Sequence, residues 1–343
     1  MKDLKFIDAT LRDGSHAIKH QLTKENIIDY CNAVDDAGLY SIVVGHGNGL
    51  GASSLQVGLS LLKDDEMLSV ARKSLKSTKL GTYMIPGFGT IEDNLRPAMD
   101  IGVDLFKIGC HCTEADTTRQ HIEFLRNNGK EVVGVLMMYH FADKVKLLEE
   151  SKKMQSYGAN GVLLMDSAGA STPQMVKEVI SFLVENLDVE VGFHAHNNLG
   201  LAVGNTLIAI EEGATIVDGT IRGFGAGAGN CQLECVIAVL EKMGVSTGVD
   251  LYKIFDAGEN IIRRIEVEKH IDKKGQGANS IVSGINGVFS AFKVHVLNAA
   301  KNFNINSYDI YKELGKRKAV AGQEDMIIEI AEKLSKEKKN DSI

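Results

Sequence analysis

Residues 161–196 read GVLLMDSAGASTPQMVKEVISFLVENLDVEVGFHAH and hold one strand–helix–strand unit. Gly161–Ser167 and Glu190–His196 are short, almost continuously apolar runs, as expected of parallel strands that are covered on both faces. Between them, Thr172-Pro173 combines a capping side chain with a proline at a first helical position, and a helical pattern continues through Met175–Glu185. This stretch therefore predicts a βαβ unit.

The same alternation extends in both directions from this unit. Six further strand-like runs are Lys5–Leu11, Ser41–Gly45, Lys79–Ile85, Leu105–Cys110, Glu131–Met138 and Ile216–Ile221, with helical patterns such as Lys24–Ala37 between them. Eight strands, each followed by a helix, over about 240 residues are typical of a (β/α)8 barrel. A doubly wound sheet would usually have fewer strands and a glycine-rich turn after the first. We therefore predict an α/β fold of the TIM-barrel type.

From about Val249 the strand-like runs stop. Helical patterns follow at Leu251–His270, Asn286–Asn302, Ser307–Leu314 and Glu324–Glu337. We predict two domains, a catalytic barrel over residues 1–248 and a C-terminal α-helical domain over residues 249–343.

Composition narrows the class of protein. The net charge is −7, with acidic and basic residues mixed along the chain, which argues against a nucleic-acid partner. The start, MKDLKFIDATLRDG, is too charged for a signal peptide, and no stretch approaches the roughly 20 apolar residues of a membrane span. Five cysteines without an export signal are most simply free thiols, so we expect a cytoplasmic protein with no membrane partner.

Polar residues gather where the predicted strands end, which is where a barrel places its active site. His194 and His196 are two apart on one strand, so both side chains point to the same side. Asp13 follows the first strand and is the best-placed carboxylate to complete a metal site with open positions. The alternative is a pair of histidines held by hydrogen bonds in a polar barrel mouth.

Several neighbouring features have two interpretations. Arg12 could be the structural partner of Asp13, or could hold a substrate carboxylate or a developing oxyanion, with His16 as a general base. The run GFGAGAGN at 223–230 is a weak dinucleotide signal and more plausibly lets backbone approach the cavity, with Asn230 donating to a site ligand. Cys110-His111-Cys112 is a weak metal signal, and ordinary packing is favoured there.

Together these residues resemble the 4-hydroxy-2-oxovalerate aldolases, a group related to isopropylmalate synthase, homocitrate synthase and hydroxymethylglutaryl-CoA lyase. The resemblance covers nearly the whole chain. Its motifs are DATLRDGSHAIKHQ (8–21), GHGNGLGASS (45–54), HCTEAD (111–116), DSAGA (166–170), HAHNNLGLAV (194–203), GAGAGN (225–230) and AGQEDMI (321–327). Related Claisen-type synthases usually carry a Glu-Arg pair in the loop at 225–230, which this chain lacks.

The resemblance implies a set of roles for residues at matching positions. Asp13, His194 and His196 would bind Mn²⁺, or Mg²⁺ or Co²⁺. Arg12 would stabilise the enolate oxygen, Ser167 would contact the pyruvyl carboxylate, and His16 would take the proton of the C4 hydroxyl. It further implies pyruvate as a product, a role in aromatic hydrocarbon catabolism and an acylating aldehyde dehydrogenase as a partner. We also expect a homo-oligomer.

The chain departs from the family pattern at the residue that hangs over the site. Phe289 stands where these aldolases usually have a tyrosine, Asn48 where aspartate is common, and Asn197 where a histidine is common. One hypothesis is that Tyr139, at the end of its strand, supplies the missing phenol. The alternative is that Tyr139 fills space.

Two other functions remain open on the sequence. The chain could be a Claisen-type synthase or lyase that uses an acyl-CoA, since those enzymes share the Arg-Asp pair and the H-x-H motif. It could also be a catalytically silent partner subunit. Arg12, Asp13, His194 and His196 are all present, which argues against a silent barrel.

Overall fold

The computed structural model describes residues 3–271 and 277–340, and its centre is a closed barrel of eight parallel strands. The strands are β1 (Lys5–Asp8), β2 (Ser41–Val43), β3 (Lys79–Met84), β4 (Leu105–His111), β5 (Glu131–Met137), β6 (Gly161–Asp166), β7 (Glu190–Ala195) and β8 (Ile216–Gly219). They pair in chain order, and β8 closes the ring on β1 with Ile216 beside Lys5. The predicted TIM barrel is confirmed, with each predicted strand found and its end shortened or extended by a few residues at most.

Helices surround the strands on the outside. They are α1 (Lys24–Val34), α2 (Asp64–Ser74), α3 (Arg96–Ile101), α4 (Arg119–Asn127), α5 (Lys144–Ser156), α6 (Pro173–Asn186), α7 (Ala202–Glu211) and α8 (Leu233–Lys242). The N-terminus of α6 forms as the sequence predicts, because the Thr172 side chain accepts a hydrogen bond from the Met175 N–H at 3.3 Å and Pro173 occupies the first turn.

The interior of the barrel is filled by alternate residues of the strands. Its apolar part includes Ile7, Val43, Tyr83, Val135 and Leu163, all buried. The residues between them face outward and join the larger core under the helices. Near the carboxyl ends of the strands the inward-facing side chains become polar. The mouth of the barrel, at these strand ends, is therefore polar and lies above the packed apolar interior.

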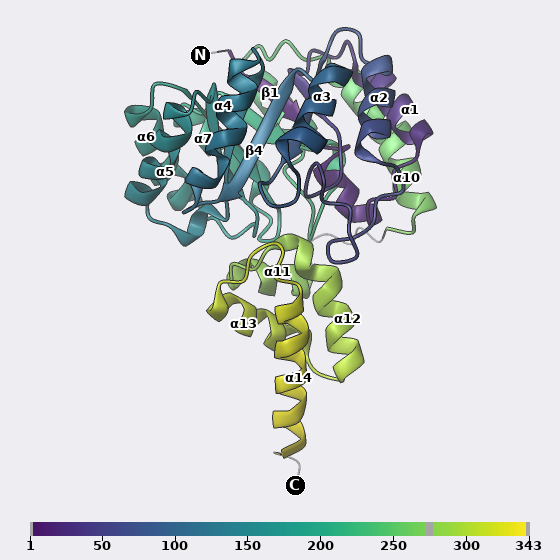
Figure 1. The fold of residues 1–343 in the computed structure, drawn as a ribbon, viewed down its shortest axis with the longest axis vertical. Helices are drawn as coiled ribbons and strands as arrows, with labels where there is room; N and C mark the ends of the chain where they lie inside the picture. Colours follow the sequence, from purple (N-terminus) through teal and green to yellow (C-terminus); the bar gives the residue numbers. More distant parts are fainter. Residues whose placement is uncertain (1–2, 272–276, 341–343) are drawn as a thin grey trace.

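The C-terminal helices form a lobe at one end of the barrel (Figure 1). They are α11 (Ala278–Ile285), α12 (Lys293–Phe303), α13 (Ser307–Arg317) and α14 (Asp325–Asn340). Their apolar core includes Phe292, Ile310 and Ile327, and it continues onto Met138 and Ala168, which follow β5 and β6. The lobe therefore covers the mouth of the barrel.

One predicted helix begins in the wrong place. The sequence pattern suggested a helix over Asn286–Asn302, but α11 ends at Ile285 and α12 starts at Lys293 after a 3₁₀ turn at Ser290–Phe292. Gly287 lies between them with a φ of 63°, a left-handed conformation that ends a helix and suits glycine. The turn that results carries Phe289 toward the barrel mouth.

The division of the chain after residue 248 stays a prediction. Helices α9 (Leu251–Ala257) and α10 (Arg263–Glu268) bury Ile254, Ala257 and Ile265 in the core cluster of the barrel. In Figure 1, α10 lies on the barrel side, beside α1. We therefore propose that the barrel unit extends to Ile271 and that the C-terminal unit begins at Gly277. None of the helices in the described residues is long and apolar enough to cross a membrane.

Candidate metal and substrate site

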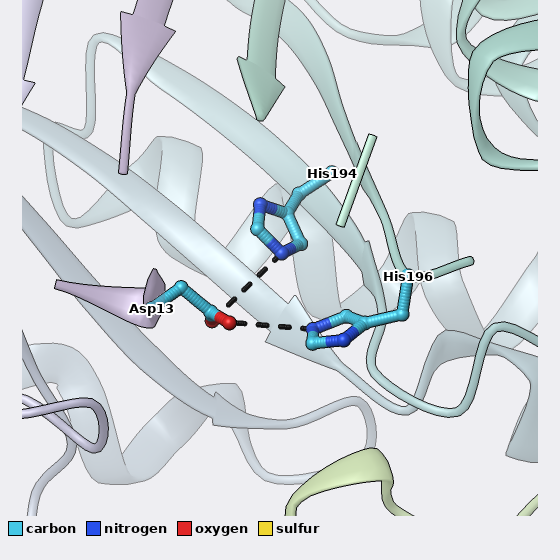
Figure 2. Close-up of side chains that lie close together, drawn as sticks. All are labelled: Asp13, His194 and His196. Carbon is cyan, nitrogen blue, oxygen red and sulfur yellow. Dashed lines mark ion pairs between the residues drawn. The ribbon is translucent and has the colours of Figure 1, made fainter. Parts of the chain in front are cut away.

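Asp13, His194 and His196 meet at the mouth of the barrel, as Figure 2 shows. One ligand atom of each lies within 4.8 Å of the other two, and Nε2 of either histidine is 3.9 Å from Asp13 Oδ2. Asp13 begins the 3₁₀ helix η1 (Asp13–Ile18), which follows the first strand, while the histidines come from the end of β7. No other group of three such ligands is found among residues 3–271 and 277–340.

The chemical state of these side chains fits a divalent cation. Burial opposes ionisation of Asp13, but the positive charge of Arg12 holds the pKa of this carboxyl well below its ordinary value. Burial also lowers the pKa of His196 to about 3, so its imidazole is neutral at neutral pH. His194 Nε2 is buried and has no hydrogen-bond partner among the described residues. A carboxylate and two imidazoles, with the Nε2 of His194 unused by the described residues, are suitable ligands for a metal such as manganese.

Arg12 is a buried cation beside the three ligands. Its Nη1 donates to Asp13 Oδ2 at 2.7 Å and to the Gly47 carbonyl at 3.1 Å, and its guanidinium lies 4.6 Å from the centre of the Tyr83 ring. Its Nε and Nη2 are buried without a hydrogen-bond partner in the described part of the chain. Arg12 thus has two donors left for a ligand in the cavity.

The glycine-rich loop after β8 holds Asp13 from the other side. Asn230 Nδ2 donates to Asp13 Oδ1 at 2.9 Å. A Cβ on Gly225 would lie 2.0 Å from that Nδ2 and 3.4 Å from Asp13 Oδ1. The loop therefore needs glycine at 225 because backbone, amide and carboxylate pack against one another there.

Three histidines form one wall of the mouth. The His20 and His46 rings stack with centroids 3.6 Å apart, and the half-buried His16 meets His20 edge-on at 4.9 Å. Burial lowers the pKa of all three, to about 2 for His20 and about 4 for His46. His16 therefore carries an uncharged imidazole at neutral pH and can accept a proton.

Two neighbouring spaces open beside these residues. A small one is lined by Arg12, Asp13, His16, His196 and Phe289. A larger one of about 590 Å³ shares His16 and Asn48 with it, and is bounded by the Gly223–Asn230 loop and by Lys293 and His295 of the C-terminal lobe. Phe289 thus closes the site from the lobe.

Two other predicted residues lie outside both spaces. Tyr139 is 1% exposed, and its hydroxyl donates to Ser171 Oγ at 2.6 Å. That geometry favours the interpretation in which Tyr139 fills space over the one in which it supplies a phenol. Ser167 is buried, its Oγ lies 3.4 Å from the Met138 N–H, and its carbonyl accepts from Ser290 N at 3.0 Å. A contact between Ser167 and a substrate carboxylate stays a prediction.

The Cys110-His111-Cys112 segment makes no metal site with the described residues. His111 Nδ1 pairs with Thr113 Oγ1 at 2.8 Å, and both cysteines are buried free thiols. The packing interpretation suits this segment.

Sequence reasoning missed two charged residues inside the barrel, Lys107 and Asp218. Asp218 forms a hydrogen bond with His194 Nδ1 and an ion pair with Lys107 Nζ. Burial by itself would raise the pKa of Asp218, but Lys107 and His194 lower it to about 2. The sequence could have revealed them, because each is a single charged residue within an apolar strand, in LFKIGC (105–110) and in IVDG (216–219).

Comparison with known proteins shows which family the sequence belongs to. A family described as HMGL-like matches residues 3–261, and the DmpG-like communication domain matches residues 276–336. A protein of Pectobacterium atrosepticum named 4-hydroxy-2-oxovalerate aldolase is 52% identical over 99% of this chain and 98% of its own length. Proteins of the same name from Spirochaeta aurantia and Carboxydothermus hydrogenoformans are 49% and 47% identical over 95% and 98% of this chain, and over 95% and 99% of their own lengths.

The fold is also found in a more distant solved structure. The carboxyl transferase domain of Rhizobium etli pyruvate carboxylase superposes with a TM-score of 0.84 over 98% of this chain and 61% of that one, at 15% identity. That likeness concerns the fold alone. The full-length matches at about half identity show the family. The chain belongs to the HMGL-like family and, within it, to the 4-hydroxy-2-oxovalerate aldolases, which are metal-dependent carbon–carbon lyases.

Proposed function

We propose that the chain cleaves a 4-hydroxy-2-oxo acid into pyruvate and an aldehyde, or runs this reaction in reverse, with Mn²⁺ as its metal and Mg²⁺ or Co²⁺ as substitutes. The observation that carries the proposal is the meeting of Asp13, His194 and His196 in one buried mouth with Arg12, whose Nε and Nη2 have no hydrogen-bond partner within residues 3–271 and 277–340. When bound, a divalent ion at this site supplies a Lewis acid that favours the negative charge of a pyruvate enolate.

Arg12 is proposed to hold the oxygen on which negative charge develops as the C3–C4 bond breaks. Its guanidinium is fixed by Asp13, the Gly47 carbonyl and the Tyr83 ring, so little reorganisation accompanies the reaction. Loss of one such donor typically lowers the rate about 10²–10³-fold.

His16 is proposed to take the proton from the C4 hydroxyl in the cleavage direction. It lines both spaces, and its lowered pKa keeps the ring neutral at the pH where a base is needed. Phe289 lies across the small space and would contact the part of the substrate that leaves as the aldehyde. Ser167 is retained as a candidate contact of the pyruvyl carboxylate.

The Claisen-type alternative is not favoured. The full-length relatives reported above are aldolases, and the 225–230 loop carries glycine and alanine with Asn230 on Asp13. A silent partner subunit is disfavoured by the three candidate metal ligands and by the two Arg12 nitrogens that have no hydrogen-bond partner among the described residues.

The partner of the C-terminal lobe is a further part of the proposal. The match of residues 276–336 to a communication domain indicates a role in contact with a second protein. We propose an acylating aldehyde dehydrogenase that receives the aldehyde, and a homo-oligomeric aldolase. Co-purification with such a dehydrogenase tests the contact, and a monomer that releases all its aldehyde into solution would count against it.

Pyruvate release tests the activity directly. Racemic 4-hydroxy-2-oxopentanoate is supplied, pyruvate is measured with lactate dehydrogenase, and the reaction is run with Mn²⁺ and then with EDTA. Turnover that needs Mn²⁺ and stops with EDTA is expected. Mn²⁺ binding without pyruvate release would contradict the proposed reaction, and thiol release from an acyl-CoA would support the Claisen-type alternative.

A further inference from the structure

Lys107 and Asp218 form a charged pair inside the barrel, where neither side chain has any exposed surface. Lys107 is on β4 and Asp218 is on β8, four strands away around the ring, so the lysine side chain crosses the interior to reach the carboxylate. Apolar side chains such as Val133 and Ile7 flank them as strand neighbours. A buried pair of this kind is costly to desolvate and contributes little net stability by itself.

Asp218 connects this pair to the candidate metal site. It lies beside His194 in the register of β7 and β8, and its Oδ1 is hydrogen-bonded to His194 Nδ1, while Oδ2 faces Lys107. A proton on Nδ1 leaves the lone pair of Nε2 directed to Asp13, and that Nε2 is the buried nitrogen without a partner in the described residues. The carboxylate therefore sets which nitrogen of His194 is available to a metal.

Neither Lys107 nor Asp218 lines the two spaces of the site. They have no surface from which to touch a substrate. They can therefore act on the reaction through their charge or through the hydrogen bond between Asp218 and His194.

We propose that Lys107 is a positioning residue, which holds Asp218 by its charge so that Asp218 orients His194 Nε2 toward the metal. This inference rests on the proposed function, because it assumes that His194 is a metal ligand. It explains why a lysine stands in the middle of an apolar strand, a location where lysine is otherwise rarely found.

The sign of the effect separates this role from simple electrostatics. An ammonium group close to a metal site repels the incoming cation, so loss of its charge alone would tighten metal binding. If Lys107 acts by holding Asp218, its loss has the opposite result and weakens binding. Loss of partners that orient a metal-binding histidine typically lowers metal affinity about 10–100-fold.

The test is a titration of the metal-free full-length protein with Mn²⁺. Electron paramagnetic resonance of the unbound Mn²⁺ measures the Kd. The variants are Lys107→Met, which keeps the length of the side chain, Asp218→Asn and the double variant. We expect each single substitution to raise the Kd about 10–100-fold. The double variant should bind no more weakly than Asp218→Asn, because both changes interrupt one connection.

Lys5→Met provides the matched control. Lys5 is also a strand lysine paired with a carboxylate, Glu190, but it lies at the opposite end of the barrel. Its substitution should leave the Kd for Mn²⁺ unchanged. Raising the Mn²⁺ concentration should restore turnover of Lys107→Met, since the residue does not touch the substrate.

Each other outcome is decisive. An unchanged or tighter Kd in Lys107→Met, or an effect that multiplies in the double variant, overturns the inference. Circular dichroism checks the fold, and if Lys107→Met does not fold, an unchanged Kd in Asp218→Asn overturns it equally. Wild-type protein that binds no Mn²⁺ would instead contradict the proposed function.

Discussion

At the scale of single residues, Phe289 and Tyr139 are the two positions at which a phenol could serve the site. Phe289 reaches the small space beside Arg12 and His16, and its ring meets Phe292 edge-on at 5.5 Å. Tyr139 follows β5 in the chain, and its hydroxyl donates a hydrogen bond to Ser171 Oγ. The position over the site is therefore apolar, and a hydroxyl can be restored there by one substitution.

Phe289→Tyr is expected to make cleavage selective for one enantiomer. An added phenol can form a hydrogen bond with the C4 hydroxyl of one configuration only, whereas an apolar ring distinguishes the two poorly. With racemic 4-hydroxy-2-oxopentanoate, wild-type protein should consume nearly all substrate and the variant about half at the fast rate. Phe289→Leu serves as the control without a hydroxyl. Equal yields from wild type and Phe289→Tyr would contradict this account.

Tyr139→Phe is expected to keep kcat and stereochemistry. The substitution removes one buried hydrogen bond, which typically lowers the free energy of unfolding by about 1 kcal/mol. Urea unfolding and the pyruvate assay measure the two quantities. A large fall in kcat with unchanged stability would revive the hypothesis of a catalytic phenol at this position.

At the scale of elements, two segments line the mouth of the barrel. One is the loop after β8, and the other is the wall of His16, His20 and His46, which lie in or after η1 and after β2. The β8 loop is held against Asp13 by Asn230. The wall is held by backbone contacts, since the Asn48 N–H donates to His46 Nδ1 at 3.0 Å and His46 Nε2 lies 3.1 Å from the Gly58 carbonyl.

Gly225→Ala is expected to weaken Mn²⁺ binding. The new Cβ would lie 2.0 Å from Asn230 Nδ2, so the amide must move away from Asp13 and release the carboxylate it holds. We expect a rise in the Kd for Mn²⁺ of about 10-fold or more. Gly204→Ala is the control, because α7 has open space at that position and alanine favours a helix there. Unchanged metal binding in Gly225→Ala would show that Asn230 has another way to reach Asp13.

Acid is expected to destabilise the protein through His46. In the unfolded chain this histidine takes a proton below about pH 6.5, whereas its pKa in the folded protein is about 4. The unfolded state therefore binds more protons between these values, and the free energy of unfolding falls as the pH drops. At pH 5, protonation of His46 in the unfolded chain lowers the free energy of unfolding by about 2 kcal/mol relative to neutral pH.

His46→Asn keeps an acceptor for the Asn48 N–H but removes the titrating ring. Its stability should change less between pH 7.5 and pH 5 than that of wild type, as measured by urea unfolding. His270→Asn, at an exposed position, should leave the difference unchanged. An equal acid response of wild type and His46→Asn would rule out His46 as a source.

At the scale of the whole molecule, the lobe is tied to the barrel through Asn198. This buried side chain donates to the Ala168 carbonyl and to Ser290 Oγ, both at 2.9 Å, and accepts from the Ala228 N–H at 3.0 Å. It therefore links the segment after β6, the β8 loop and the turn that carries Phe289. The position of Phe289 over the site depends on these links.

Asn198→Ala is expected to lower the free energy of unfolding by about 2–4 kcal/mol, since two buried groups, the Ala168 carbonyl and the Ser290 hydroxyl, and the half-buried Ala228 N–H lose this hydrogen-bond partner. Hydrogen exchange should accelerate in residues 278–292 and in the 223–230 loop. Asn205→Ala is the control, because the buried Asn205 Nδ2 donates to the Ser171 carbonyl, and both residues precede the C-terminal lobe. Exchange that changes equally in both variants would mean that Asn198 does not hold the lobe.

Much of this architecture could be predicted from the sequence because it follows from local rules. Apolar runs such as Gly161–Ser167 form buried parallel strands, and alternation along a strand places His194 and His196 on one side. Because a barrel gathers its active site at the carboxyl ends of the strands, Asp13 could be assigned to the same mouth. The sequence also suggested that Asn230 donates a hydrogen bond in the site, but its partner Asp13 was identified only by the structure.

The remaining features depend on tertiary packing. A left-handed turn at Gly287 moved the start of α12, and helices α9 and α10 joined the barrel because their apolar faces fit it. The direction of the Tyr139 hydroxyl followed from the location of Ser171, 32 residues away in the chain.

By itself, then, the sequence determined the barrel, the lobe and the meeting of Asp13 with the two histidines, since residue periodicity and strand ends control these. Only the tertiary structure paired Lys107 with Asp218, which are 111 residues apart, and joined them to His194. Closing the barrel brings opposite strands within reach of one side chain. No spacing along the chain encodes that distance.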